Sequence, residues 1–526
     1  MQAPCRTDPV PLVSTGAGAG PTGAAPAPRR LLLIHGAARI ACFDAARREL
    51  RDASLLVADN RVALLADGRD AAALAAIDDV IATHVPRATL ERIDARGHVV
   101  LPGLVNTHHH LFQTLTRALP AAQDSDLFGW LRALYPVWGH YDPPAFVTAA
   151  RTGIGELLLS GCTTTSDHQY LFPPGVRLDD TIAAARALGI RFHACRGAMS
   201  VGESAGGLPP DALTEREGDV LEDMARVVAA HHDPRPYAMT RVALAPCSPF
   251  SVSRELMTRT AELARALGVG LHTHLAENRH DVDYSRERFG QTPAEYAESL
   301  GWLGPDVWHA HCVKLDDAGA RRFAQTGTGI AHCPCSNMRL ASGIAPVARW
   351  LGAGIRVGLG VDGSASNDSG DLLAEARQAM LLARVRAATQ DAPADARAPG
   401  PGAGDPDPRA PGAPALMGAR EALSLATRGG AAVLGRDDIG GLAPGMAADI
   451  ALFDLRGLRT SGSAADEDPL AAIVFCAPSR AAWTIVDGRI VVAHGRLVSE
   501  DEDALANEQA AAWRRVRSRV GAGLSG

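Results

Sequence analysis

The sequence predicts an α/β protein, a (β/α)8 TIM barrel with a small β-sandwich domain formed by both chain ends. Apolar runs alternate with helical patterns through the middle of the chain, polar side chains end several of these runs, and further short apolar runs lie near both chain ends. Repeated strand–helix alternation favours a parallel barrel, and polar residues at the strand ends are typical of its active face. The 526 residues, 47% of them hydrophobic, can form a large core and more than one domain.

The runs near the two chain ends predict antiparallel strands of one composite domain. Turn residues separate them, and Asp487-Gly488 within the last run favours a tight hairpin. We expect residues 30–100 and 440–500 to form this β-sandwich together. The runs occupy residues 31–35, 54–57, 61–65, 448–453 and 483–492.

The middle of the chain, residues 101–439, carries the alternation that predicts the barrel. Gly189, Gly268 and Gly354 each stand between a helical pattern and the following strand, as is typical of the loops that end helices. Helices are expected at 146–159, 180–188, 254–267, 316–325 and 372–388. Eight strands are expected near 104–107, 163–167, 190–195, 241–245, 269–274, 307–311, 328–332 and 355–361.

Two tracts rich in glycine, alanine and proline stand outside this pattern. Residues 1–29 are expected to be a disordered N-terminal extension, and residues 391–414 a flexible insertion between two helices. The last segment, 501–526, is expected to form a C-terminal helix.

Composition and charge narrow the class of partner. The net charge is −7 and no basic stripe is present, which argues against nucleic acid and favours a free small molecule. No apolar run is long enough for a membrane span, and no signal-peptide pattern begins the sequence. The nine cysteines are scattered without a CxxC pair, which is typical of a reducing compartment. We therefore expect a cytoplasmic protein that acts on small molecules.

Histidines and one aspartate end several of the predicted strands. In His108-x-His110, the alternation of side chains along a strand puts both imidazoles on one side and His109 on the other. His274 and Asp362 end two further runs. A single histidine at a strand end is more often a packed core residue than a ligand, but four such donors together favour a metal. Three nitrogens and one oxygen suit one Zn²⁺, with Fe²⁺ as the alternative.

Three side chains beside these donors are candidates for proton transfer. Glu277 lies one turn past His274, where its carboxylate can reach a group bound at the metal; the alternative is a glutamate favoured by a helix N-terminus. His311 can orient a water, and Asp362 can accept the proton of that water. Lys314 is the only lysine of the chain and lies beyond the sixth strand. A site with two metals bridged by a modified lysine is therefore not available.

The same region contains a glycine pattern that also occurs in dinucleotide-binding proteins. Gly358-x-Gly360-x-x-Gly363 fits it literally, but an aspartate lies inside the pattern and no acidic residue follows between 377 and 390. A nucleotide site is therefore a poor interpretation of these glycines.

Four stretches of the chain resemble the amidohydrolase superfamily, and within it the mononuclear aminohydrolases that act on purines and triazines. They are residues 101–110, 272–277 (HTHLAE), 310–312 and 360–363. Further stretches resemble the bacterial 8-oxoguanine deaminases of that family, namely 110–117, 131–138, 167–173, 244–251 and 336–343. The resemblance covers about residues 31–500. It departs from the family pattern at the insertion 391–414 and at Gln169, where a second histidine is expected.

The resemblance implies hydrolytic deamination, in which metal-bound hydroxide attacks the ring carbon that carries an exocyclic amine. For 8-oxoguanine the products are urate and ammonia. Glu277 would protonate the neighbouring ring nitrogen, His311 would stabilise the attacking oxygen, and Asp362 would pass a proton to the leaving amine.

The resemblance also names candidates for substrate binding. Gln113 matches a glutamine that contacts substrate in related deaminases, and its planar amide can pair with a ring carbonyl and N–H. Arg196 is a candidate donor to a second carbonyl; the alternative is a salt bridge at the barrel rim. His168 and Tyr170 are further candidates.

Two alternative functions stay open at this point. One is a triazine aminohydrolase or chlorohydrolase, or another purine or pyrimidine deaminase of the same superfamily. The other is a non-catalytic binding protein, which would be expected to lack a site residue. Relatives of this kind imply a homo-oligomer. All six expected site residues are present: His108, His110, His274, Glu277, His311 and Asp362.

Overall fold

The structure is a computed structural model that describes residues 28–390, 416–476, 478 and 480–521. The predicted insertion 391–414, and all but the last two residues of the predicted extension 1–29, lie outside the described residues. Within the described ranges, no helix is both long and apolar enough to cross a membrane.

Eight parallel strands close into a barrel, which confirms the predicted fold class. Each strand is hydrogen bonded to its neighbours, and the pair Leu359–Asn106 closes the ring. The predicted and observed strands agree to within a few residues. In chain order the strands are β6 (Leu104–Asn106), β7 (Cys162–Gln169), β8 (Arg191–Ala198), β9 (Thr240–Pro246), β10 (Gly270–Leu275), β11 (Val307–His311), β12 (Gly329–His332) and β13 (Arg356–Leu359).

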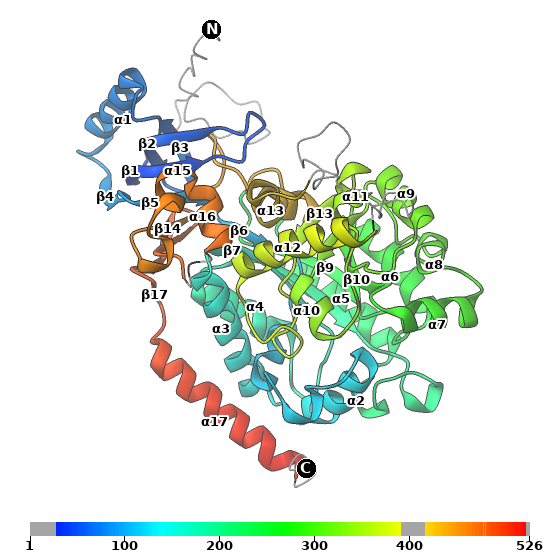
Figure 1. The fold of residues 1–526 in the computed structure, drawn as a ribbon. Helices are drawn as coiled ribbons and strands as arrows, with labels where there is room; N and C mark the ends of the chain where they lie inside the picture. The colour runs from blue at the N-terminus through cyan, green and yellow to red at the C-terminus, as the bar shows by residue number, and fades with distance from the viewer. Residues whose placement is uncertain (1–27, 391–415, 477, 479, 522–526) are drawn as a thin grey trace, which may run out of the picture.

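Helices around the barrel connect its strands (Figure 1). Their ends follow local signals: Asp142 accepts a hydrogen bond from the N–H of Ala145 at the start of α3, and Gly189 and Gly268 end α4 and α6 with φ of 80° and 67°. All five predicted helices are present. The helices of this region are α2 (Leu127–Trp138), α3 (Pro143–Leu159), α4 (Leu178–Leu188), α5 (Glu217–His231), α6 (Arg254–Leu267), α7 (Arg279–Phe289), α8 (Pro293–Ser299), α9 (Asp317–Thr326), α10 (Pro334–Arg339), α11 (Val347–Gly352), α12 (Leu372–Gln390), α13 (Ala419–Ser424) and α14 (Gly430–Val433).

Strands from both chain ends form a second sheet beside the barrel, as predicted (Figure 1). The strands expected as a β-sandwich follow one continuous hydrogen-bonded order, β17-β16-β15-β14-β5-β1-β2-β3, and β4 pairs with β1. Asp487 and Gly488 join β15 to β16 with φ of 50° and 71°, as a tight hairpin requires. The elements are β1 (Arg30–Ala41), β2 (Glu49–Ala58), β3 (Arg61–Ala66), α1 (Ala71–His84), β4 (Thr89–Asp94), β5 (His98–Pro102), β14 (Ile450–Asp454), α15 (Ser463–Glu467), α16 (Pro469–Phe475), β15 (Trp483–Val486), β16 (Arg489–Ala493) and β17 (Arg496–Leu497).

A buried ion pair fastens this sheet to the barrel. Arg191, the first residue of β8, binds Asp449, which directly precedes β14, through two N–O contacts of 2.9 Å. The side chains of both residues are almost fully buried. After β17 the chain continues into α17 (Glu502–Val520), which lies along α3 (Figure 1), where Arg151 binds Glu508.

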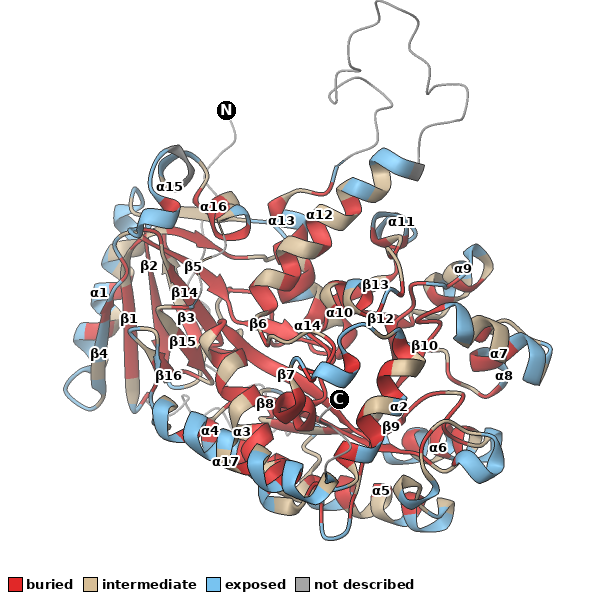
Figure 2. Cartoon of the chain, turned by 60° about the horizontal axis from the view of Figure 1, so that its bottom comes forward, coloured by how far each residue is buried: buried red, intermediate tan, exposed pale blue. Residues whose placement is uncertain are grey.

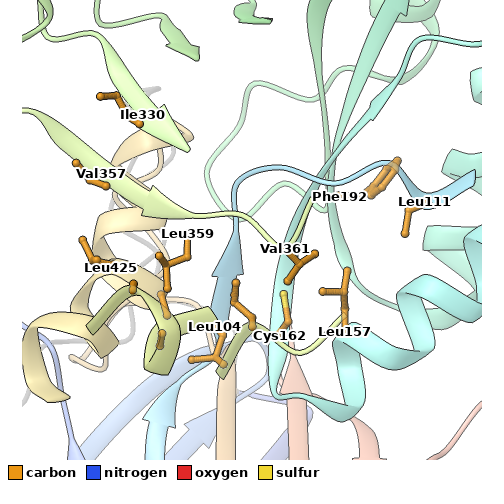
Figure 3. Packing of buried hydrophobic residues seen from close by; sticks show 14 of the residues in the cluster. Leu104, Leu111, Leu157, Cys162, Phe192, Ile330, Val357, Leu359, Val361 and Leu425 are labelled. Carbon is orange, nitrogen blue, oxygen red and sulfur yellow. The ribbon is translucent and has the colours of Figure 1, made fainter. Parts of the chain in front are cut away.

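The largest apolar cluster fills the space between the barrel strands and the surrounding helices. Figure 2 shows the strands buried and the outer faces of the helices exposed. In Figure 3, Leu359 packs beside Leu425, and Val361, Cys162 and Leu157 pack together where α3 covers the strands. This packing fixes the strand ends, and with them the side chains that follow the strands.

Candidate active site and metal centre

The carboxyl ends of four barrel strands bring the predicted site residues together. His108 and His110 follow β6, His274 is the second-last residue of β10, His311 ends β11, and Asp362 follows β13. All but His274 are buried, and His274 is partly exposed. The strands of a barrel converge at this face, and the site is therefore assembled from distant parts of the chain.

Four donor atoms lie at the spacing of ligands around one metal ion. The Nε2 atoms of His110 and His274 are 3.1 Å apart, and Asp362 Oδ1 lies 3.3 Å from His110 Nε2 and 3.4 Å from His108 Nε2. Tetrahedral ligands at about 2.0–2.1 Å from zinc are roughly 3.3 Å from one another. His108 Nε2 is buried without a hydrogen-bond partner among the described residues. The donor set therefore fits one divalent metal.

Backbone carbonyls orient two of these imidazoles. Nδ1 of His110 lies 2.7 Å from the carbonyl oxygen of His168, and Nδ1 of His274 lies 2.6 Å from that of Cys247. A carbonyl only accepts, so each Nδ1 carries the proton and each Nε2 presents a lone pair. Burial lowers the pKa of His110 to about 3 and the pKa of His274 well below its usual value. Neutral imidazoles of this kind are metal ligands.

Glu277, His311 and Asp362 form a connected series beside these donors. His311 Nε2 lies 3.5 Å from Glu277 Oε2 and 3.8 Å from Asp362 Oδ2. Burial raises the pKa of Glu277 to about 7. Burial opposes the charge of His311, but Glu277 and Asp362 hold its pKa above the usual value. Burial also opposes ionisation of Asp362, but His108 and His311 hold its pKa well below the usual value. The series can therefore hold and move protons near neutral pH.

Polar neighbours hold the members of this series in place. Ser336 and Ser366 donate to Asp362 Oδ2 at 2.6 and 3.1 Å, and Ser342 donates to Glu277 Oε1 at 3.3 Å. Nδ1 of His311 donates to Asn337 Oδ1 at 3.0 Å. Sequence reasoning did not assign a role to these residues, although 336–343 was one of the stretches that resemble the family.

The backbone around the site is strained at several non-glycine residues. Positive φ is uncommon for such residues and concentrates at functional sites. Five of them, with φ between 51° and 69°, end β11 or lie shortly after β10, β11, α10 and β13: Ala276, His311, Cys312, Ala341 and Asp362.

A cavity opens beside the donor set. Its polar side includes the four groups His110, Glu277, His311 and Asp362, and also Gln113. Its apolar side comes mainly from α2 and two loops, with Leu127, Trp130, Leu131, Phe250 and Leu340. A cavity lined by apolar side chains and a few polar groups is typical of a binding site for a small molecule.

The structure brings two of the four predicted substrate-binding residues to this cavity. Gln113 and Tyr170 line it, and Gln113 Nε2 donates to the Tyr170 hydroxyl at 3.3 Å. Gln113 lies against Gly363, where a Cβ would meet its Oε1 at 1.9 Å. This glycine therefore makes room for Gln113, which explains part of the pattern that also occurs in dinucleotide-binding proteins.

The other two candidates do not line the cavity. His168 lies among the imidazoles, and its Nε2 pairs with the carbonyl oxygen of Ala245 at 2.6 Å. Arg196 binds Glu215 and Asp223 at 2.7 Å, with its guanidinium 3.7 Å from the ring centre of Phe172. The structure thus gives Arg196 the contacts of the salt-bridge alternative and does not place it among the residues that line the cavity.

Comparisons with known proteins agree with this geometry. The model of the amidohydrolase family matches residues 99–491. The chain is 46% identical over 408 residues to 8-oxoguanine deaminase of Pseudomonas aeruginosa, covering 76% of this chain and 85% of that protein. It is 37% identical over 433 residues to hydroxydechloroatrazine ethylaminohydrolase of a Pseudomonas species, covering 81% and 85%. Atrazine chlorohydrolase of Arthrobacter aurescens, solved in complex with zinc, is 33% identical with a TM-score of 0.80, covering 92% of this chain and 100% of that one.

The family predicted from the sequence is thus confirmed by the barrel, by the histidine-rich strand ends and by these similarities. The matched region spans most of the chain and contains every residue of the candidate site. The chain belongs to the amidohydrolase family, and it is a hydrolase that acts on carbon–nitrogen bonds.

Proposed function

We propose that the protein is a metal-dependent hydrolytic deaminase of 8-oxoguanine that releases urate and ammonia. The observation that carries this proposal is the series Glu277–His311–Asp362 beside the donor set, in one cavity. The identity to a bacterial 8-oxoguanine deaminase supports the choice of substrate.

We propose one Zn²⁺ per chain, held by His108, His110, His274 and Asp362. The donor spacing supports a single metal ion, and the zinc complex of the related chlorohydrolase supports zinc over Fe²⁺. When bound, the metal supplies the Lewis acidity that makes water a nucleophile at neutral pH.

The chain's own residues supply the proton transfers. Glu277, with a pKa of about 7, holds a proton on its carboxyl group and gives it to the ring nitrogen next to the attacked carbon. Nε2 of His311 faces both carboxylates and donates to the attacking oxygen. Asp362, kept ionised, accepts one proton of the water at Oδ2 and delivers it to the leaving amine. The second proton of the water returns to Glu277 as the product carbonyl forms, so each turnover consumes one water and restores both carboxyl groups.

The cavity walls select a flat substrate. The amide of Gln113 pairs with a ring carbonyl and N–H, and the apolar side chains of α2 cover the ring face.

Ammonia release from zinc-loaded protein tests the proposal. A panel of 8-oxoguanine, guanine, isocytosine and hydroxyatrazine is followed by ultraviolet spectra together with ammonia and alkylamine release. We expect 8-oxoguanine to be converted to urate with the highest kcat/KM. Glu277→Gln is expected to lower that kcat/KM by roughly 10²–10⁴-fold, because it removes the proton that the ring nitrogen receives.

Glu375→Gln is the matched control for this variant. Glu375 is equally buried and burial also raises its pKa to about 7, but it lies outside the cavity. Its substitution is expected to leave kcat/KM unchanged. Turnover of hydroxyatrazine alone would establish the triazine alternative, and turnover of nothing by the metal-loaded protein would refute the proposed reaction.

A further inference from the structure

His272 lies next to the metal centre without belonging to the predicted donor set. It precedes His274 by two residues on β10, so both side chains point to the same side of the strand. Its Nε2 lies 2.7 Å from His108 Nδ1, and its Nδ1 lies 2.9 Å from the carbonyl oxygen of Trp308. Its ring stacks on that of Trp308, with centroids 4.6 Å apart and planes 15° from parallel. The side chain is fully buried.

The hydrogen-bond partners fix where the protons of this pair lie. The carbonyl of Trp308 only accepts, so Nδ1 of His272 carries the single proton of a neutral imidazole. Nε2 of His272 is then an acceptor, and His108 must donate its Nδ1–H to it. This leaves the lone pair on His108 Nε2, the atom that has no other hydrogen-bond partner among the described residues and lies 3.4 Å from Asp362 Oδ1.

The hydrogen bond that orients His108 differs in kind from those that orient His110 and His274. His110 and His274 donate to backbone carbonyls, which a substitution cannot remove. His108 instead donates to a side chain. Its orientation and tautomer therefore depend on the identity of residue 272, and a substitution there isolates this contribution.

We propose that His272 is a positioning residue. It donates its Nδ1–H to the Trp308 carbonyl, accepts the Nδ1–H of His108 at its Nε2, and thereby fixes His108 as an Nε2 ligand of the metal. This inference rests on the proposed metal site. An acceptor at residue 272 stabilises the ligand tautomer of His108. Without it, the Nδ1–H of His108 is buried and unpaired, and the ring can turn or exchange its proton to the other nitrogen.

Zinc affinity tests the proposed role of His272 without a measurement of turnover. Metal-free full-length protein is titrated with zinc against a chromophoric chelator, and the dissociation constant is compared among variants. His272→Phe keeps a flat ring on Trp308 but removes the acceptor, and we expect the affinity to fall by roughly 10–100-fold. His272→Gln returns an acceptor oxygen, and we expect the affinity to recover by most of that factor.

His309→Phe is the matched control. His309 is also fully buried, lies on the neighbouring strand and pairs with the carbonyl of Trp302 at 2.9 Å, but it does not contact the donor set. Its substitution is expected to leave zinc affinity unchanged. Melting temperatures of the metal-free variants separate loss of folding from loss of affinity, and His272→Leu takes the place of His272→Phe if the latter does not fold.

The outcomes separate this inference from the proposed function. Equal zinc affinity of His272→Phe and the unmodified chain would overturn the proposed role of His272 while leaving the metal site intact. Equal loss in His272→Phe and His272→Gln would also overturn it, because packing rather than an acceptor would then matter. If the unmodified chain itself bound no zinc, the proposed metal site would fail instead.

Discussion

Two buried polar clusters of this molecule differ in how completely they are satisfied. At the junction of the sheet and the barrel, Arg191 donates to both oxygens of Asp449 and to the carbonyl oxygens of Tyr237 and Ala238. At the carboxyl ends of the strands, buried atoms of His108, His168 and Gln113 have no hydrogen-bond partner among the described residues.

The difference fits a structural role for the first cluster and the proposed metal site for the second. Buried polar groups are almost always paired, because an unpaired one costs free energy. The junction meets this requirement by itself and joins two distant parts of the chain. The histidine cluster does not: the unpaired atoms of His108 and Gln113 lie where the proposed metal and substrate would pair with them.

The largest effect on stability is expected at the junction. Asp449→Ala removes the carboxylate that binds the buried Arg191 guanidinium at 2.9 Å and leaves only Asp487 at 3.4 Å, and we expect a loss of about 3–5 kcal/mol in the free energy of unfolding. Chemical denaturation measures it. The control is Asp94→Ala, which breaks the exposed pair with Arg96 and should leave the unfolding midpoint unchanged. Equal effects of the two variants would contradict the structural role of the junction.

Metal binding is expected to stabilise the protein through the other cluster. At a free zinc concentration 1,000 times the dissociation constant, binding adds about 4 kcal/mol to the free energy of unfolding. Melting temperatures with and without zinc report it. His110→Ala should abolish the shift, whereas Asp449→Ala should retain it, because that residue lies at the opposite end of the strands. A zinc shift that survives in His110→Ala would place the metal elsewhere.

The strand ends are the part of the site that the sequence could predict. A barrel strand has a side-chain period of two and ends at one common face, so a histidine or aspartate just after an apolar run has a defined position. The structure brings His108, His110, His274 and Asp362 together as that reasoning requires. The same period would also have found His272, two residues before His274.

The side-chain period of two also explains why Arg196 does not line the cavity. On β8, Phe192 and Ala194 share its side of the strand and belong to the cluster that packs against the outer helices, while Cys195 belongs to a cluster made by several barrel strands. Arg196 therefore points away from the barrel interior, toward Asp223 on α5. The prediction considered only the position of Arg196 after an apolar run and not its side.

The cavity wall from α2 could not be predicted from these patterns. Leu127, Trp130 and Leu131 are apolar residues of an amphipathic helix, and such residues usually face a core. Only the path of the segment between β6 and α3 turns them toward the site. Likewise, Ser336 and Ser342 are ordinary loop or helix residues until the fold places them beside Asp362 and Glu277.

Glu375 lies between the two clusters in character: its buried carboxyl group has hydrogen-bond partners, as at the junction, but those partners are neutral. It accepts from Asn367 Nδ2 at 2.7 Å and from the N–H of Cys335 at 3.1 Å, and burial raises its pKa from 4.5 to about 7. The folded state thus prefers the protonated form. The stabilisation is complete below about pH 4.5 and is lost as the pH rises through about 7.

The pH dependence of unfolding in Glu375→Gln tests this assignment. The shift corresponds to at most about 3 kcal/mol between pH 4.5 and 8. We expect the free energy of unfolding of the metal-free variant to fall less steeply with pH than that of the unmodified chain. The plots of the free energy of unfolding against pH for the variant and the unmodified chain should approach each other or cross above pH 7. Parallel lines would show that Glu375 keeps its usual pKa in the folded protein.

The smallest effect is expected where a hydroxyl only adjusts a carboxyl group of the proposed active site. Ser342 donates to Glu277 at 3.3 Å, a long hydrogen bond that favours the ionised form and lowers the pKa of Glu277. Ser342→Ala is expected to lower kcat/KM by less than about tenfold, since one hydrogen bond contributes about 1 kcal/mol. Because Glu277 then keeps its proton to higher pH, the alkaline limb of the pH–kcat/KM profile should move upward. Ser336→Ala, which removes a donor to Asp362, should instead weaken zinc binding. If both variants changed zinc affinity alike, the assignment of Asp362 as metal ligand and Glu277 as proton donor would be wrong.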